Sequence, residues 1–365
     1  MNLPDALIEA VSQRLERFTA DQLSAAADLG AEAQAFVRSG ADAMDGGKRL
    51  RARFCLTGWQ AVREFQGARA AAPTPDVVAA AAALEVFHAA ALVHDDVVDN
   101  SDTRRGRPAA HRRWESAHRD ASWDGDPAGF GRSAAILLGD LLVAWSDDLL
   151  EEGLATADAA HAAPARRVYA VMRRDVTVGQ FLDVAEEAAY RTAPDSEHVA
   201  RALRVASLKS ARYSVQHPLL LGAALAGADT AQSDALERFG HPIGLAFQLR
   251  DDVLGVFGDA AVTGKPSGDD LREGKRTLLI AYAREAMTPG ARRVLDELVG
   301  DPALDDEQIA ALQSTIVDTG ALARVEELIT EYALEADRAL RGAPLGTTAV
   351  GALRDLALAA TARAA

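Results

Sequence analysis

The sequence predicts an all-α protein. Alanine and leucine dominate its 365 residues, hydrophobic residues make up 49% and aromatic residues only 5%, and this composition favours packed helices over the strands of a sandwich or barrel. Two apolar segments that each end in a pair of aspartates have the length of helices. No Pro-, Gly- or Ser-rich linker divides the chain, so residues 1–365 are predicted to form a single domain.

The predicted helices are separated by segments with turn chemistry, of which Pro73-Thr74-Pro75, residues 123–127 and residues 264–268 are the clearest. In chain order, helices are expected at residues 5–38, 48–65, 76–99, 107–119, 133–152, 160–189, 196–210, 211–227, 232–257, 275–287 and 305–341. The helix at 76–99 is rich in alanine. Its small side chains would allow neighbouring helices to approach closely, or leave an apolar channel beside it.

Charge and cysteine content exclude several classes of protein. The net charge of −15 argues against a general nucleic-acid binder, which needs a basic surface. The single cysteine, Cys55, excludes an intrachain disulfide framework and fits a reducing, cytoplasmic location. Residues 1–10 lack a signal-peptide core. The apolar segment at 77–93 contains Glu85 and His88, so a buried core helix is expected there and no membrane span.

Two acidic clusters carry the strongest functional signal. They are Asp95-Asp96-Val97-Val98-Asp99 and Asp251-Asp252-Val253-Leu254-Gly255. Asp95 and Asp99 are four residues apart and therefore share one face of a helix. Carboxylates this close repel one another unless a cation lies between them, and Mg²⁺ is the hard, oxygen-preferring ion that commonly bridges carboxylates to a phosphate-bearing substrate. The clusters predict an enzyme that acts on diphosphates.

Basic residues provide candidate sites for those phosphates. In Gly46-Gly47-Lys48-Arg49-Leu50-Arg51, glycines precede a helix whose first turn is cationic, which opposes the helix dipole. A bound anion would remove that conflict, and Lys48 and Arg51 lie on one face. Taken alone, this segment could equally be a solvated turn, and Arg104-Arg105-Gly106-Arg107 a surface loop. His88 and Glu85, three residues apart, could form a buried core pair.

The order of these motifs resembles the trans-prenyl diphosphate synthases. The resemblance spans residues 44–280 and includes Gly46-Gly-Lys-Arg-Leu-Arg51, His94-Asp-Asp-Val-Val-Asp99, Thr103-Arg-Arg-Gly-Arg107, Gly179-Gln-Phe-Leu-Asp183, Lys209-Ser210, Phe247-Gln-Leu-Arg-Asp-Asp252 and Gly264-Lys-Pro266. It implies an isoprenoid synthase helical bundle around a central active-site cavity. It also implies an Mg²⁺-dependent prenyltransferase that condenses isopentenyl diphosphate with dimethylallyl, geranyl or farnesyl diphosphate through an allylic carbocation.

The resemblance also assigns roles to residues. It implies Asp95, Asp99 and Asp251 as the main metal ligands, joined by Asp96, Asp252 and Asp183, with about three Mg²⁺ ions per active site. The allylic diphosphate would be held by Arg104, Lys209, Lys265 and Gln248. Isopentenyl diphosphate would be held by Lys48, Arg51, His88 and Arg105. Gln180, Ser210 and Lys275 are further candidate substrate-binding residues. Phe247 could turn its ring face toward the carbocation.

Product length in this family depends on side-chain bulk before the first aspartate. The relevant positions are Ala90 and Ala91 here, so a growing chain is expected to pass them and stop at Phe87, one turn further down the same face. This predicts geranylgeranyl diphosphate, with longer products as an alternative. The family often has a third aspartate where this chain has Gly255. Because Asp251 and Asp252 remain and Asp259, Asp269 and Asp270 lie nearby in the sequence, reduced or rearranged metal ligation is expected instead of loss of the metal.

Two alternative functions use the same features. A class I terpene cyclase also ionises a prenyl diphosphate at an aspartate-rich helix, but it would not need a second diphosphate-binding group such as Lys48, Arg51 and His88. A non-catalytic regulatory subunit of a prenyl synthase would keep the fold but would tolerate loss of the aspartates. The resemblance further implies a homodimer formed through helices.

Overall fold

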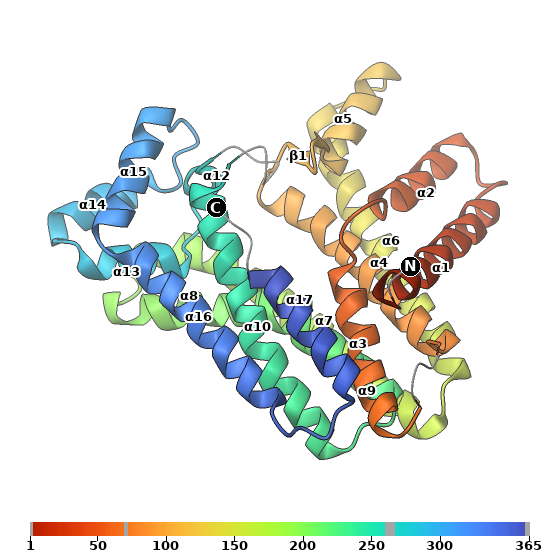
Figure 1. Ribbon diagram of the computed structural model, residues 1–365. Helices are drawn as coiled ribbons and strands as arrows, with labels where there is room; N and C mark the ends of the chain where they lie inside the picture. The colour runs from red at the N-terminus through yellow and green to blue at the C-terminus, as the bar shows by residue number, and fades with distance from the viewer. Residues whose placement is uncertain (1–2, 69–71, 260–266, 362–365) are drawn as a thin grey trace.

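The computed structural model describes residues 3–68, 72–259 and 267–361. Within these ranges the protein is helical apart from one short hairpin, which confirms the predicted all-α class (Figure 1). The elements are α1 (Leu3–Ala25), α2 (Ala31–Ala43), α3 (Leu50–Phe65), α4 (Pro75–Val98), β1 (Thr103–Arg104), β2 (Arg107–Pro108), α5 (Ala110–Asp120), α6 (Pro127–Thr156), α7 (Ala159–Ala189), η1 (Tyr190–Thr192), η2 (Asp195–Glu197), α8 (His198–Val205), η3 (Ala206–Gln216), α9 (His217–Leu225), α10 (Thr230–Phe257), α12 (Asp269–Glu273), α13 (Leu278–Ala286), α14 (Pro289–Leu298), α15 (Asp306–Asp318), α16 (Ala321–Leu340) and α17 (Thr347–Thr361).

Two of the predicted helices are each divided in the structure. The helix predicted at 5–38 is α1 followed by α2, and the chain turns at Gly30, whose φ is 94°. The helix predicted at 305–341 is α15 followed by α16, with Gly320 at φ 77° between them. Glycine adopts this left-handed conformation without steric cost. The breaks were missed because a single glycine interrupts each otherwise helical sequence.

Other boundaries also differ from prediction. The boundary predicted between residues 210 and 211 is wrong, because α8, η3 and α9 form one continuous run whose middle part, η3, is a π-helix. Helix α5 starts later than predicted because β1 and β2 pair as a hairpin before it. Helix α6 starts earlier because the Asp126 carboxylate accepts hydrogen bonds from the backbone N–H groups of Ala128 and Gly129, which caps it. Helices α12, α14 and α17 were not predicted.

The central helices bring the two aspartate segments to one end of the protein. Helix α4 packs along α6, α3 packs against α9, and α10 packs against η3 and α16. Figure 1 shows α4 and α10 running toward the same end, where β1 and α12 lie. Among the described helices, α4 alone is long and apolar enough to cross a membrane, but 78% of its apolar stretch is buried within the protein. It is therefore a core helix.

The last helix, α17, is attached to the helix that carries the second aspartate cluster. It packs against α3 and α10. Arg250, directly before that cluster, donates from Nε to the carbonyl of Thr361 at 3.1 Å. The same guanidinium forms a two-pronged ion pair with Glu326 of α16, a geometry that fixes both groups strongly. The end of α17 and the C-terminal part of α10 are thus held together.

Candidate active site

The first aspartate cluster occupies the last turn of α4. Asp95 and Asp96 lie within the helix and Asp99 is its C-terminal cap. Asp96 is 3% exposed and accepts a hydrogen bond from Arg104 Nε at 2.8 Å. Burial and the nearby Asp95 carboxylate raise the pKa of Asp99 to about 6. The crowding of carboxylates that the sequence predicts is therefore present, and part of it is neutralised by the arginine of the hairpin.

Two lysines and a glutamine connect this cluster to other helices. Lys209 of η3 pairs with Asp183 of α7 and lies 3.4 Å from Asp95 Oδ1. Burial opposes the charge on Lys209, but these two carboxylates hold its pKa above the ordinary value. Gln180 Nε2 donates to Asp95 Oδ1 at 2.9 Å. Lys275 Nζ lies 3.9 Å from Asp99 Oδ2. The two lysines form a cationic layer beside the aspartates.

The position of Lys209 depends on a close approach of two helices. Gly179 of α7 faces η3, and a Cβ atom at this position would lie 2.4 Å from the backbone nitrogen of Lys209. Only glycine therefore allows α7 and η3 to approach closely enough to place Lys209 between Asp183 and Asp95. The π-helical geometry of η3 is also typical of functional sites in long helices.

The second aspartate cluster lies near the C-terminal end of α10. Asp252 is 7% exposed and accepts a hydrogen bond from Gln248 Nε2 at 2.6 Å. Burial, together with repulsion from Asp270, raises the pKa of Asp252 to about 8. Asp251 and Phe247, on the same helix, are partly exposed. Lys275 links the two clusters, since it lies close to Asp99 and also contacts Asp270 at 3.3 Å.

The basic turn before α3 is held by a buried glutamate. Arg49 has a left-handed conformation with φ 51°, which directs the chain into the helix. Glu85 of α4 is 5% exposed and accepts a hydrogen bond from the backbone N–H of Ala52 at 2.9 Å. Its other oxygen lies 3.8 Å from Arg49. Glu85 thus caps α3 and offsets the cations at its start, so the pair considered between Glu85 and His88 is not what the structure contains.

His88 belongs to a second group of polar residues. Its Nδ1 atom lies 3.2 Å from the hydroxyl of Tyr213, on η3. Arg51 stacks over the Tyr213 ring at 4.2 Å and donates to Ser214 Oγ at 2.8 Å. Burial and four surrounding arginines lower the pKa of His88 well below its ordinary value, so the imidazole is neutral. An anion bound beside Arg51 would face neutral hydrogen-bonding groups and arginines.

The other predicted substrate-binding residues lie in the hairpin, in the glycine turn and next to Lys209. Arg105 donates to the carbonyl of Asp45 at 2.9 Å and lies over Gly47, so the hairpin contacts the glycine turn. Lys48 is exposed beside it, and Ser210 is partly exposed next to Lys209. Lys265 lies outside the described residues.

The residues proposed to limit product length form part of an aromatic group. Phe87 packs edge-on against Tyr169 and Tyr213, with ring centroids 6.3 and 5.8 Å away. Ala90 is buried and Ala91 is partly exposed. The three rings come from α4, α7 and η3, so the barrier predicted at Phe87 has contributions from two tyrosines that the sequence did not single out. Tyr169 is itself fixed by a hydrogen bond to Ser146.

Sequence reasoning missed Tyr213 and the capping role of Glu85. Tyr213 follows Lys209 by four residues, a spacing that brings helical side chains together and could have revealed it. Glu85 acts through its contact with Ala52, 33 residues away in the chain, and no local sequence pattern indicates that contact.

The residues present fit a hard divalent cation. The acidic side chains of both clusters offer only carboxylate oxygens, the ligands that Mg²⁺ prefers. Within the described ranges, no group of three His, Cys, Asp or Glu side chains is placed so that it could hold a metal ion. Mg²⁺ in proteins commonly keeps several waters and is completed by substrate phosphates. Asp95, Asp99 and Asp251 would hold it, with Asp96, Asp252 and Asp183 around them, and burial would strengthen its attraction to them.

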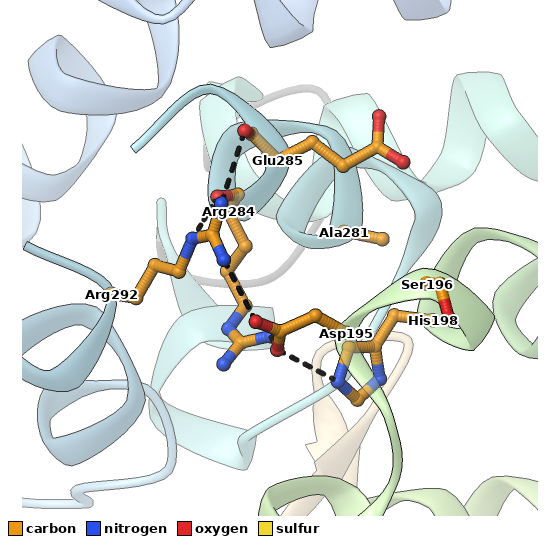
Figure 2. A pocket seen from close by; sticks show the side chains of 7 residues that line it. All are labelled: Asp195, Ser196, His198, Ala281, Arg284, Glu285 and Arg292. Atoms are coloured by element: carbon orange, nitrogen blue, oxygen red, sulfur yellow. Dashed lines mark hydrogen bonds and ion pairs between the residues drawn. The ribbon is translucent and has the colours of Figure 1, made fainter. Parts of the chain in front are cut away.

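A separate polar hollow of about 210 Å³ lies between α13 and the start of α8. Figure 2 shows Asp195 between Arg284 and Arg292, with His198 beside it. Asp195 accepts hydrogen bonds from Arg284 at 2.9 Å and from Arg292 at 2.7 Å. Arg284 is further paired with Asp296 at 2.8 Å. Both arginines have carboxylate partners, and the residues that line this hollow include neither of the two aspartate clusters.

Comparisons with known proteins find related enzymes. The chain is 38% identical to a solved geranylgeranyl pyrophosphate synthase of Corynebacterium glutamicum, complexed with isoprenyl diphosphate and magnesium, with a TM-score of 0.91 over 100% of both chains. A geranylfarnesyl diphosphate synthase of Aeropyrum pernix is 32% identical over 79% of this chain and 80% of its own. A nonaprenyl diphosphate synthase of Mycobacterium tuberculosis is 29% identical over 85% and 82%, respectively.

The predicted resemblance is therefore confirmed over the helices that carry both aspartate clusters. The polyprenyl synthetase sequence model matches residues 35–316, a range that contains the glycine turn, the arginine hairpin, the two aspartate clusters and both lysines. With that match and its helical fold, the chain belongs to the polyprenyl synthetase family.

Proposed function

We propose that this protein is an Mg²⁺-dependent trans-prenyltransferase whose main product is geranylgeranyl diphosphate. In the reaction, the C–O bond of an allylic diphosphate breaks and the diphosphate leaves with the bonding electrons. The double bond of isopentenyl diphosphate then attacks the allylic cation, a C–C bond forms, and loss of a proton restores a double bond. Family membership supports this trans-prenyl diphosphate synthase chemistry.

The charges around the aspartate clusters suit the departure of a diphosphate. Bound Mg²⁺ would neutralise charge that develops on the leaving group. Lys209 and Lys275, held among Asp95, Asp99 and Asp270, would contribute fixed positive charge in a partly buried site, where such charge acts most strongly. Arg104, paired with Asp96, would adjust its position when the diphosphate binds.

The group around Tyr213 supports a second diphosphate site. Arg51 and the neutral His88 meet on Tyr213, and Arg105 anchors the nearby glycine turn through Asp45. This second cationic group is the observation that favours the synthase, because a cyclase ionises one diphosphate and has no use for another. We place isopentenyl diphosphate beside Arg51, with Lys48 and Arg105 at its edge.

The geometry of α4 supports the twenty-carbon product. Asp95, Ala91 and Phe87 succeed one another at four-residue spacing and so lie on one face. At 1.5 Å per residue, Phe87 lies about 12 Å below Asp95 along the helix axis. Ala91 and Ala90 present only methyl groups, which would leave room for a growing chain, whereas the aromatic group of Phe87, Tyr169 and Tyr213 would block it.

The direct test is incubation of the purified protein with Mg²⁺, labelled isopentenyl diphosphate and each allylic primer, followed by chromatography of the dephosphorylated alcohols. A dominant twenty-carbon alcohol is expected. Products of thirty carbons or more would still support a synthase but would contradict Phe87 as the residue that limits chain length. If no primer is elongated, the synthase assignment is contradicted. Hydrocarbon products would then indicate a cyclase, and the absence of any product would indicate a regulatory subunit.

Replacing Phe87 with alanine is expected to lengthen the product by about one or two five-carbon units, because removal of a buried phenyl ring opens space below Ala91. Ala91→Phe is the matched opposite change, and fifteen-carbon product should dominate there because an aromatic ring then lies one turn below Asp95. Alcohol chain length is read by chromatography under identical conditions. An unchanged product from Phe87→Ala would place the barrier elsewhere.

We also propose that the protein forms a homodimer in the cytoplasm, through α6 and α7. Ion pairs of Arg166 with Glu151 and of Arg173 with Asp147 join these helices, in antiparallel order along the chain. Ile136, Leu137, Val178, Phe181 and Val184 of the two helices are 42–69% exposed. An apolar surface of this kind on neighbouring helices favours a protein interface over solvent.

Phe181→Glu should therefore convert the dimer into a monomer, since it introduces a charge into an apolar interface. Leu358→Glu on α17 is the matched control, because Leu358 is similarly exposed, at 64%, but lies on a different face. Light scattering coupled to size-exclusion chromatography gives the mass of each variant. A wild-type monomer, or dissociation by both variants alike, would contradict this interface.

A further inference from the structure

Lys275 lies on the short connection between α12 and α13, and its side chain reaches both aspartate-bearing regions. Its Nζ atom lies 3.3 Å from Asp270 Oδ1, 3.9 Å from Asp99 Oδ2 and 2.6 Å from Glu273 Oε2. Residues 275–277 lie outside both helices. The position of the ammonium group therefore depends on what else holds this connection in place.

The next residue, Arg276, contacts a different group of residues. Its side chain is 8% exposed, and its Nη2 atom donates to the carbonyl of Val299 at 2.9 Å. Its guanidinium carbon lies 4.7 Å from the centre of the Tyr190 ring, which is within the range of a cation–π interaction. The connection is thus held twice, toward the aspartates by Lys275 and toward the interior by Arg276.

Tyr190 relates this contact to the rest of the proposed site. It is 1% exposed and caps the C-terminal end of α7, the helix that carries Asp183. Asp183 pairs with Lys209, the other lysine beside the aspartates. Both lysines are therefore positioned relative to one helix, Lys209 through Asp183 and Lys275 through Arg276 and Tyr190.

Arg276 is an unfavourable residue at this position if stability alone is considered. Burial lowers its pKa below the ordinary value. Among the described residues, its Nε and Nη1 atoms have no hydrogen-bond partner. Asp296 Oδ1 lies 3.9 Å from Nη1, but Asp296 is already paired with Arg284 at 2.8 Å. A buried charge with so few partners opposes folding, and an apolar side chain of similar length would fill the same space without that cost.

We propose that Arg276 is a positioning residue, which holds the backbone at Lys275 against Tyr190 and so keeps the lysine ammonium between the two aspartate clusters. The proposal rests on the proposed function, in which Lys275 stabilises the charge of the departing diphosphate. Loosening this connection should slow the chemical step, because a misplaced charged group stabilises the transition state less. Binding of isopentenyl diphosphate, placed beside Arg51, should be unaffected.

The test compares two variants of the full-length protein. Arg276→Met removes the charge with little change of volume, and Arg284→Met is the matched control. Arg284 also lies on the Tyr190 ring, at 5.1 Å, but it belongs to α13 and is not adjacent to Lys275. Arg276→Met should lower kcat for elongation about tenfold, with KM for isopentenyl diphosphate within about twofold of the wild type.

Thermal unfolding separates positioning from stability. Arg276→Met should unfold within about 3 °C of the wild type, because an unfavourable buried charge is lost together with its contacts. Arg284→Met should unfold at a clearly lower temperature, because it leaves Asp296 without its 2.8 Å partner. Below that temperature, its kcat should stay within about twofold of the wild type.

A double-mutant cycle shows whether the effect passes through the lysine. Adding Arg276→Met to Lys275→Met should change kcat less than about twofold, whereas two independent effects would multiply. A second readout needs no turnover, namely the rate at which acetic anhydride acetylates each lysine, measured by mass spectrometry. Lys275 should be acetylated several times faster in Arg276→Met, because its ammonium leaves its carboxylate partners, while Lys209 should react at the wild-type rate.

A wild-type kcat in Arg276→Met, losses that multiply in the cycle, or unchanged acetylation of Lys275 would overturn the proposal. If Arg284→Met does not fold, the cycle with Lys275 and the acetylation rates still decide. A wild-type protein that elongates no primer would contradict the proposed function instead. The acetylation rates would then still show whether Arg276 holds Lys275 in place.

Discussion

Replacing Asp95 with asparagine should lower kcat/KM for chain elongation by about 10²–10³-fold, with folding preserved. Asp95 is the aspartate with the most contacts to the cationic layer, since Gln180 donates to it and Lys209 and Arg104 lie within 3.6 Å. These cations outweigh the effect of burial and lower its pKa, whereas the pKa values of Asp96 and Asp99 are raised. Asparagine keeps the shape but removes the charge that would bind Mg²⁺.

The assay is steady-state elongation with saturating Mg²⁺, together with circular dichroism to verify folding. Asp148→Asn is the matched control, because Asp148 belongs to another acidic pair but is exposed on α6, and its activity should equal that of the wild type. Activity of Asp95→Asn within about threefold of the wild type would show that this carboxylate is not a metal ligand. Loss of a metal ligand is expected to lower activity by much more than this threefold limit.

Replacing Glu85 with alanine should reduce the free energy of unfolding by about 2–4 kcal/mol. The buried N–H of Ala52 would lose its acceptor, and Arg49 would lose the carboxylate that lies 3.8 Å away. Because Arg51 follows in the same turn, the Michaelis constant for isopentenyl diphosphate should rise about tenfold or more, through misplacement of the binding group. The Michaelis constant for the allylic substrate should change much less.

Urea unfolding and steady-state kinetics measure these two effects separately. Glu85→Gln is the informative companion, because the amide oxygen can still accept from Ala52 while the charge is lost. Glu85→Gln should recover much of the free energy of unfolding that Glu85→Ala loses. It should still show part of the rise in the Michaelis constant for isopentenyl diphosphate. Equal rises in both Michaelis constants would indicate general disorder of the site instead of a specific role for Glu85 in positioning Arg51.

The sequence was sufficient to predict the class of fold and the central helices, because composition and apolar periodicity act locally. It was also sufficient to single out residues such as Asp95, Lys209 and Gln180, which come from separate helices and contact one another in the structure. Lys209 and Gln180 were named through the resemblance to the trans-prenyl diphosphate synthases. The membership of Asp251 and Lys265 in the same site stays a prediction, and the latter lies outside the described residues.

The elements and residues that were missed depend on distant contacts. Helix α17 is held through Arg250, and α12 through Gly300, partners that no local pattern reveals. Asp270 could be named from the sequence as a carboxylate near the second cluster, but its contact with position 255 is visible only in the structure.

The bond from Arg250 to the carbonyl of Thr361 has a consequence for the order in which the protein can be completed during synthesis. Because residue 361 is synthesised 111 residues after residue 250, this bond forms only once α17 has been made, although Glu326 of α16 can pair with the Arg250 guanidinium earlier. Truncation before α17 is therefore expected to leave the C-terminal part of α10, and the aspartates on it, less firmly held.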